Sequence, residues 1–410
     1  MEKQFFKNTE TLLRQMEGPF GPYIESFARL LTDQGYAQCS VGSRLRLIAD
    51  FTHWLEQQRI IVKEITPEHI KQYLKQPHCS ARKGYALTLQ RFLDLLCKQG
   101  VIQKETTSIE QTPVELLADE FRSYLRQERA LAEPTVIYYL NFISRFLKDR
   151  FGDGEVNLSA LCAADVVGFV ERQAASLHPK RAKVMTTALR SFLQYARYRG
   201  DLKIDLVAAV PTVANWAMAS IPRFLPPYQI ELVLASCNRQ TAVGRRDYAI
   251  LLLLARLGLR GGEVVALTLD DIDWEDGYIS IRGKGGHQTI MPLPIDVGEA
   301  IAAYLKDGRP SSANRHLFLR SLAPTVGFRG PMAISSLVMH ALRRAGIDAP
   351  HKGAHLFRHS LATGMLGQGA SLAEIGELLR HRSPETTTIY AKVDLGSLRP
   401  LALPWPGGDL

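Results

Sequence analysis

The stretch DYAILLLLARLGLRGGE, residues 247–263, decides the fold of the C-terminal part of this 410-residue chain. Residues 247–257 are almost wholly apolar, which predicts a helix that is buried on all sides. Arg260 follows that helix directly and precedes two glycines, so its guanidinium emerges where a backbone can pass close to a ligand. An arginine at this place can also satisfy the carbonyls of a helix end, so the stretch alone leaves its role open.

Around this buried helix, the apolar spacing predicts further helices and one hairpin. The hairpin is expected where residues 278–282 and 289–293 alternate with period two around Gly283-Lys284-Gly285-Gly286. The helices are expected at residues 228–237, 297–305, 334–345, 355–367 and 372–379. This part of the chain is therefore predicted to mix α and β structure, with helix in the majority.

Two helical domains are predicted before it, because apolar residues fall at helical spacing over residues 27–100 and 121–200. The two stretches resemble each other at an offset of 100 residues: Leu89, Phe92, Leu93 and Gly100 match Leu189, Phe192, Leu193 and Gly200. The match indicates a duplicated domain, although two unrelated helical bundles would share much of this periodicity. Residues 206–227 hold four prolines and little helical pattern, which is typical of an interdomain linker.

We therefore expect a mainly α protein with a small β-hairpin or sheet in its last domain, an α+β class. The expected domains are residues 1–110, 111–205 and 228–395, with a linker at 206–227 and a tail at 396–410.

The composition favours a polyanionic partner, because the net charge is +9 and the isoelectric point is about 9.3. No basic tail carries the excess. The first residues lack the apolar core of a signal peptide, and the longest apolar run is far too short to span a bilayer, so we expect a cytoplasmic protein with no membrane partner. The five cysteines form no CxxC pair and suggest no disulfide framework, so each is expected to be a small buried side chain.

Polar residues that local structure does not require occur in four separated segments of the last domain. They are Arg260, Lys284, His355, Arg358, His359, His381 and Tyr390. Taken singly, each has an ordinary explanation, such as a solvated turn lysine or a core tyrosine. His355, Arg358 and His359 share one helical face, at positions i, i+3 and i+4. His355 and His359 also have the spacing of two zinc ligands, but no good third ligand accompanies them and no metal is expected.

The ordered set is what cleavage of a phosphodiester by tyrosine would need. Two guanidinium forks can bind the non-bridging oxygens of a phosphate bidentately as charge develops on them. A phenol, with an ordinary pKa of about 10, needs cationic neighbours or a base to help it lose its proton. A lysine can protonate the departing sugar oxygen. This chemistry needs no metal and no other cofactor.

Over residues 112–395 the sequence resembles the tyrosine recombinase (phage integrase) family. The motifs that carry the resemblance lie at residues 255–263, 283–285, 355–360, 379–381 and 387–390. The resemblance implies that Tyr390 attacks a DNA phosphate, giving a 3′-phosphotyrosyl bond and a free 5′-hydroxyl. Arg260 and Arg358 would hold the phosphate, and Lys284 would protonate the leaving 5′-oxygen.

The resemblance assigns further supporting roles. His355 would act as acid or base near the tyrosine, His381 would donate a hydrogen bond to the phosphate, and Glu263 and His359 would support these groups. This chain departs from the family's usual pattern in having Arg380 where a glycine is common and Phe357 where a leucine is common; neither touches a catalytic group. The candidate DNA-binding residues are Arg82, Lys83, Lys183 and Arg380.

The family's architecture implies a core-binding, SAM-like helical domain at residues 111–205 and a catalytic domain at 228–395. We expect a site-specific DNA recombinase or integrase that acts on double-stranded DNA with specific recombination sites, as a homotetramer and through a Holliday junction. Integration, excision or transposition of a mobile element is the expected task. Related recombinases and accessory proteins are open as further partners.

Other readings remain at this point. A type IB-like topoisomerase or a telomere resolvase shares the same chemistry, and a catalytically inactive DNA-binding relative would share the fold. Residues 1–110 are expected to add DNA or subunit contacts. The tail at 396–410 either docks on a neighbouring protomer or is disordered.

Overall fold

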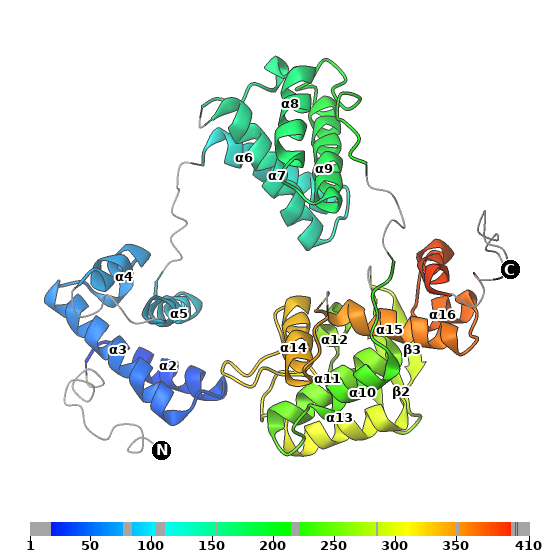
Figure 1. Cartoon of the computed structure of the whole chain (residues 1–410). Helices are drawn as coiled ribbons and strands as arrows, with labels where there is room; N and C mark the ends of the chain where they lie inside the picture. The colour runs from blue at the N-terminus through cyan, green and yellow to red at the C-terminus, as the bar shows by residue number, and fades with distance from the viewer. Residues whose placement is uncertain are drawn as a thin grey trace. The chain divides into compact units, whose positions relative to one another are not determined.

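The computed structural model describes residues 18–76, 84–102, 111–152, 154–214, 221–283, 286–349, 352–394, 398 and 400. The chain divides into two compact units, residues 1–105 together with 220–410, and residues 106–219. Helices make up most of both units, and the described residues contain one three-stranded antiparallel sheet (Figure 1). The expected mainly α class with a small sheet is thus confirmed. No helix among the described residues is long and apolar enough to cross a bilayer.

The described residues of the N-terminal domain form four helices. They are α2 (Gly21–Asp33), α3 (Gln38–Gln57), α4 (Pro67–Leu74) and α5 (Tyr85–Lys98). Their apolar faces meet in one core, in which the rings of Phe27 and Phe92 stand edge to face with centroids 5.5 Å apart. Helix α4 begins where it does because Thr66 and His69 form a capping box and Pro67 occupies its first position.

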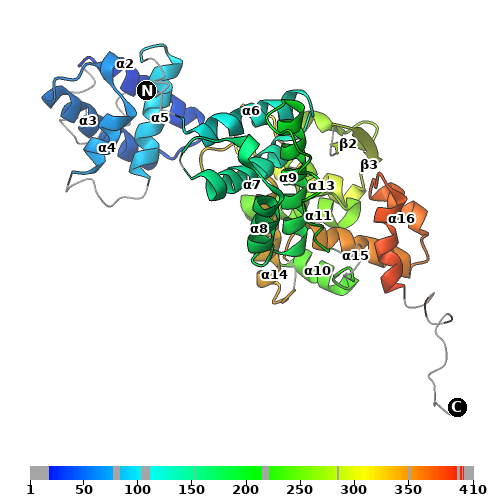
Figure 2. The ribbon, with the colours of Figure 1, turned by 90° about the horizontal axis from the view of Figure 1, so that it is seen from above.

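In the second unit, too, the described residues form four helices. They are α6 (Pro113–Gln127), α7 (Glu133–Phe151), α8 (Ala163–Ala174) and α9 (Pro179–Tyr198). Its core contains an edge-to-face pair, Phe121 with Phe192, with centroids 5.3 Å apart. Thr112 and Glu115 form the capping box that starts α6, with Pro113 between them. Figure 2 labels α2–α5 and α6–α9, which form two separate helical bundles.

The two bundles share one plan. Over the residues that the structure describes, each has two helices, then a short 3₁₀ turn, then two more helices, with the turns at Val62–Glu64 and Leu158–Ala160. The aromatic pair of α2 with α5 recurs between α6 and α9 at nearly the same distance and angle. All six apolar residues of the predicted match, Leu89, Phe92 and Leu93 with Leu189, Phe192 and Leu193, are buried. The two bundles thus share their order of helices and an aromatic pair, and the duplication itself stays a prediction.

The last part of the chain is organised around α11 (Ala242–Leu257). This helix runs through the core and packs against α13 (Ile295–Asp307) and α15 (Ala354–Gly367). Eleven of its sixteen residues are buried, as the apolar run predicts. The helix begins five residues earlier than expected. Thr241 caps it by accepting a hydrogen bond from the Gly244 backbone at 3.0 Å, and Arg246 and Asp247 pair inside the protein, so these polar residues extend the helix.

The other helices of this part surround α11. They are α10 (Pro227–Ala235), α12 (Gly261–Ala266), α13 (Ile295–Asp307), α14 (Pro331–Arg344), α15 (Ala354–Gly367) and α16 (Leu372–Leu378). Five of these, all but α12, lie where the apolar spacing predicts a helix. The six-residue α12 is too short for that spacing to detect. After α16 the chain continues as two 3₁₀ turns, Pro384–Thr386 and Thr388–Val393.

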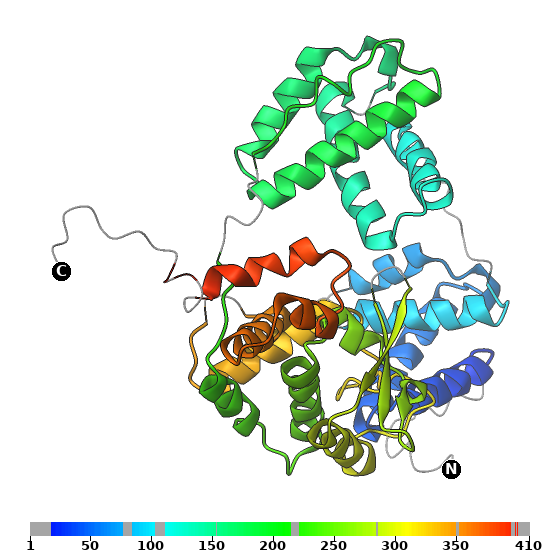
Figure 3. The same cartoon turned by 90° about the vertical axis from the view of Figure 1, so that its right-hand side faces the viewer.

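The sheet has the strand order β1 (Ile272–Asp273), β2 (Tyr278–Arg282), β3 (Gln288–Pro292). Strands β2 and β3 form the predicted hairpin, with Tyr278 opposite Pro292 and Arg282 opposite Gln288. Figure 3 shows this hairpin as two long twisted strands in yellow-green beside the helices of the same unit. Strand β3 begins one residue earlier than expected. The hairpin tip, with Lys284 and Gly285, lies outside the described residues.

The described part of residues 206–227 contains no helix before α10 begins at Pro227. Both of its ends are nevertheless packed: Leu206 and Val210 belong to the core of the second unit, and Leu225 belongs to the core around α11. The expectation for the cysteines is wrong in part. Cys237 is buried, but Cys39 and Cys162 are exposed, each at the beginning of a helix.

Candidate active site

The site begins at Gly258, where α11 ends in a left-handed conformation with φ of 58°. A Cβ at this position would come within 2.7 Å of Leu379 Cδ2 and 3.1 Å of Leu361 Cδ2. The Gly258 carbonyl accepts a hydrogen bond of 2.6 Å from Arg358 Nη1. The turn thus delivers Leu259 to the core and Arg260 to the start of α12.

We expect Gly258→Ala to lower the free energy of unfolding by about 1–3 kcal/mol, because it adds left-handed backbone strain and a contact with Leu379 in a packed core. Urea unfolding measures the change. Gly262→Ala is the matched control, since a Cβ there meets no atom within 4 Å and its φ is not positive. Equal stability of the two variants would contradict this account of the turn.

Glu263 is the buried centre of the arginine cluster. Its carboxylate accepts hydrogen bonds from the Arg260 backbone at 2.8 Å, from Arg260 Nη1 at 2.7 Å and from Arg380 Nη2 at 3.0 Å. Burial alone would raise the pKa of Glu263, but the Arg260 hydrogen bonds and the charges of Arg380 and Arg260 lower it overall. One carboxylate therefore orients two guanidinium groups and stays ionised.

Arg380 does not lie as a DNA contact would. Its guanidinium points inward to Glu263, its side chain is 10% exposed, and its backbone has φ of 55°. Burial lowers the pKa of Arg380, partly offset by Glu263. Its predicted DNA-binding role is not supported by this geometry. Arg380 instead adds a positive charge from behind the cluster.

Arg358 is held by two carbonyls. It lies on α15, is 3% exposed, and donates to the carbonyls of Gly258 and Leu379, which come from two other segments. Burial lowers the pKa of Arg358 to about 10, helped by repulsion from Arg260 and Arg380, so the group stays protonated at neutral pH. The two carbonyls fix the plane of the guanidinium, as a bidentate phosphate ligand requires.

Tyr390 lies in the last 3₁₀ turn with its side chain enclosed, and the residue is 1% exposed. Its hydroxyl is 3.0 Å from His359 Nδ1, and the two rings have centroids 5.6 Å apart. Burial raises the pKa of Tyr390, while the charges of Arg358 and Arg260 oppose the increase. The histidine that contacts the tyrosine hydroxyl is therefore His359.

His355 was expected beside the tyrosine. Its ring lies 6.5 Å from that of His359, one helical turn along α15. Burial and then the charges of Arg358 and Arg260 lower the pKa of His355, so it is neutral at pH 7. Its place next to the arginine cluster suits contact with the phosphate better than contact with the phenol. The sequence spacing places His355 and His359 on one helical face. It does not show which of the two contacts the tyrosine hydroxyl.

His381 lies in the segment that follows α16, near the arginine cluster. Its Nδ1 is 2.7 Å from Thr387 Oγ1. Burial, followed by the charges of Arg358, Arg260, Arg380 and His359, lowers the pKa of His381 to about 4. When the Thr387 hydroxyl donates to Nδ1, the ring proton resides on Nε2 and can be donated to a phosphate oxygen.

This pKa predicts how the stability of the DNA-free protein depends on pH. The unfolded His381 titrates near 6.5 and the folded one near about 4, so the unfolded chain binds more protons between these values. The stabilising contribution is fully present above pH 6.5 and is lost as the pH falls toward 4. Urea midpoints over this range should decline less in His381→Asn than in the wild type. An identical decline in both would contradict the assignment.

Of the four remaining expected site residues, the structure describes one, Lys183. Lys284, Arg82 and Lys83 lie outside the described residues. Lys183 is exposed on α9, in the other compact unit. The described residues hold no group of three or more His, Cys, Asp or Glu side chains that could bind a metal ion.

The chain has relatives of known family. Residues 223–396 match the model of the phage integrase family, and residues 118–200 match that of the phage integrase N-terminal SAM-like domain. The candidate integrase/recombinase y4rA of Sinorhizobium fredii is 49% identical over 98% of this chain and 99% of its own length. The tyrosine recombinase XerD of Vibrio cholerae is 28% identical over 71% of this chain and 96% of its own length.

A solved structure shares the fold. The XerH site-specific recombinase, bound to a palindromic difH substrate in a post-cleavage complex, aligns with a TM-score of 0.57 at 20% identity, covering 77% of this chain and 94% of its own. The chain therefore belongs to the phage integrase family of tyrosine recombinases.

Proposed function

We propose that this protein is a site-specific DNA recombinase that cuts and rejoins strands through a 3′-phosphotyrosyl bond at Tyr390. The observation that carries the proposal is the contact of the Tyr390 hydroxyl with His359, close to the charges of Arg358 and Arg260. A phenol is a poor nucleophile near neutral pH unless a base accepts its proton or cations stabilise its anion, and both kinds of group are present here.

The proposed cleavage forms one bond to phosphorus and breaks another. The Tyr390 oxygen bonds to the phosphorus as its proton passes to His359, and the bond from phosphorus to the 5′-oxygen breaks. Lys284 gives the departing oxygen its proton, a role implied by the family resemblance. Because Tyr390 is 1% exposed, the turn Thr388–Val393 has to shift when DNA binds. Ligation is the reverse of this step and needs no nucleotide cofactor, since the phosphodiester energy is kept in the phosphotyrosine.

The phosphate itself would be held by four side chains. Arg260, whose side chain is 33% exposed, and Arg358 would bind its non-bridging oxygens, and neutral His381 would donate a further hydrogen bond. Charge that develops on these oxygens in the transition state would then meet donors that are already oriented by Glu263 and two backbone carbonyls. His355, in the first turn of α15, would also contact the phosphate.

The proposed substrate is double-stranded DNA carrying specific sites, and the proposed active form is a homotetramer that exchanges strands through a Holliday junction. Two cuts on each of two duplexes need four tyrosines, one from each protomer. We propose movement of a mobile element as the task and the bacterial nucleoid as the place of action. Helices α2–α5 form a domain that resembles the second unit, and we propose that this domain extends the contact with DNA.

A strand-joining assay tests this function against the topoisomerase alternative. Two duplexes of different length, each carrying the sequence that flanks the natural element, are mixed with the protein. The expected product joins a strand of one duplex to a strand of the other. Relaxation of supercoiled DNA with no joint product would favour a topoisomerase, and absence of both reactions would favour an inactive relative.

A further inference from the structure

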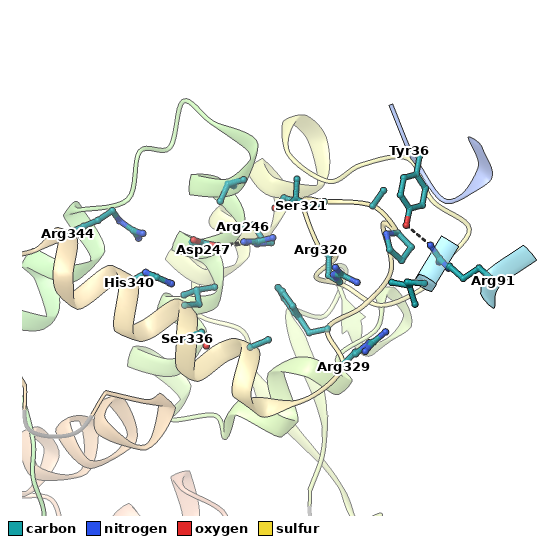
Figure 4. A pocket seen from close by; sticks show the side chains of 18 of the residues that line it. Tyr36, Arg91, Arg246, Asp247, Arg320, Ser321, Arg329, Ser336, His340 and Arg344 are labelled. Carbon is teal, nitrogen blue, oxygen red and sulfur yellow. Dashed lines mark hydrogen bonds and ion pairs between the residues drawn. The ribbon is translucent and has the colours of Figure 1, made fainter. Parts of the chain in front are cut away.

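Arginines from two domains gather around one cleft of about 860 Å³ within the first compact unit. Figure 4 shows Arg344 and His340 on α14 at one side and Tyr36 with Arg91 at the other, with Arg246 and Arg320 between them. The first side belongs to the catalytic domain and the second to the N-terminal helical domain. The active-site arginines are separate from this set.

The two walls are joined by specific contacts. The Thr325 backbone N–H and hydroxyl both donate to the Gln34 carbonyl, at 2.9 and 3.2 Å. Arg91 donates to the Tyr36 hydroxyl and to Gln34 Oε1. Between them, Gly35 has φ of 77°, and a Cβ there would lie 2.7 Å from Thr325 Oγ1. The two segments approach each other so closely at this point that only glycine fits at position 35. The contact between the two walls is therefore specific.

The cleft carries a strong excess of positive charge. Of the described residues that line it, six are arginines and a single one, Asp247, is acidic. Arg246 neutralises that carboxylate with hydrogen bonds of 3.0 and 2.7 Å. Among the residues that the structure describes, Arg320, Arg329 and Arg344 have no carboxylate partner. Arg44 lies over the ring of Tyr36, 4.6 Å from its centroid, which orients the guanidinium and leaves its charge uncompensated.

Helix α14 lines the cleft and also packs against α12, the helix that follows Arg260. The first residue of this helix, Pro331, packs against Gly261, the neighbour of Arg260: a Cβ on Gly261 would lie 3.5 Å from that of Pro331. Arg329 precedes the helix by two residues, and His340 and Arg344 lie further along it, on the face that lines the cleft. Arg329 therefore lies just before the end of α14 that packs near Arg260, and Arg344 is the last residue of the helix.

We propose that this cleft binds the sugar–phosphate backbone of DNA next to the cleaved phosphate, with the N-terminal domain as its outer wall. The inference rests on the proposed function, since it assumes that DNA lies at Arg260. Guanidinium groups suit this ligand because each can bind two oxygens of a phosphate, and a row of them fits a regularly spaced polyanion. The N-terminal domain and the catalytic domain would then bind the same stretch of DNA.

The test measures how binding depends on salt. Fluorescence anisotropy of a labelled mixed-sequence duplex gives the slope of log affinity against log salt concentration for each variant of the full chain. The double variant Arg44→Ala/Arg344→Ala removes one arginine from each wall. Arg29→Ala/Arg315→Ala is the matched control, with one exposed arginine from each domain and the same loss of charge. The lysine versions, Arg44→Lys/Arg344→Lys, keep the charge.

The slope is expected to decrease by about 2 in the alanine cleft variant, since two phosphate contacts are lost, and by less than about 0.5 in the control. The lysine variant should keep the wild-type slope. An unchanged slope in the cleft variant, or an equal decrease in the control, would overturn the proposal. A third result would also overturn the proposal. In it, a free nucleoside monophosphate stabilises the wild type but not the cleft variant, while the slope for DNA is the same in both proteins.

The two proposals fail in different ways. If the proposed function is wrong, the wild type forms no covalent complex with a nicked duplex, whatever the salt slopes are. If the cleft proposal is wrong, the cleft variant keeps its slope in a protein that still forms the covalent complex.

Discussion

Tyr390→Phe is expected to abolish the covalent DNA–protein complex and to leave DNA affinity nearly unchanged. The substitution removes the oxygen that would bond to phosphorus but keeps the ring, which is packed in a core with Ile375 and Leu379. One hydrogen bond to His359 is lost, which costs about 1 kcal/mol of stability. The measurement uses a suicide duplex, nicked near the cleavage site so that the cut strand diffuses away, and a denaturing gel that detects protein attached to DNA.

Tyr304→Phe is the matched control for this experiment. Tyr304 is also 1% exposed, and its hydroxyl also makes one hydrogen bond, accepting from the Leu319 backbone at 3.2 Å. The control variant should lose similar stability but still form the covalent complex. If the complex persisted in Tyr390→Phe, another residue would be the nucleophile. If both variants lost it, a general loss of structure would be the cause.

Arg358→Lys is expected to slow cleavage about 100–1000-fold with a much smaller effect on DNA affinity. The ammonium group keeps the positive charge, so long-range attraction to DNA is retained. It cannot, however, donate to the Gly258 and Leu379 carbonyls and also present two parallel donors to a phosphate, as the planar guanidinium can. Single-turnover cleavage of the suicide duplex measures the rate, and anisotropy measures the affinity.

Arg315→Lys provides the comparison, because Arg315 is an exposed arginine that pairs with Asp270 on the surface. It should cleave at the wild-type rate. Equal rates for Arg358→Lys and the wild type would mean that charge alone is needed at position 358. If the affinity fell as much as the rate, Arg358 would contribute to binding DNA before cleavage and would have no special role in the transition state.

Much of the fold is readable from local patterns. The hairpin was predicted within one residue because Tyr278–Arg282 and Gln288–Pro292 alternate clearly and are separated by glycines. Helix α11 was found from its apolar run, but its start was misplaced because Arg246 and Asp247 are polar residues that become buried by pairing with each other. The cysteine expectation failed for Cys39 and Cys162 because a helix start can expose a side chain whatever its type.

The sequence by itself determined the chemistry of this protein: the order of Arg260, Arg358, His381 and Tyr390, their separation by helical and hairpin segments, and the family that this order marks. Tertiary structure decided which groups meet. His359 and not His355 contacts the tyrosine, Arg380 turns inward to Glu263, and Gln34 joins Thr325 to close an arginine-lined cleft. The physical reason is that spacing along one helix defines a shared face, whereas contacts between segments far apart in sequence depend on how buried surfaces pack, which no local pattern records.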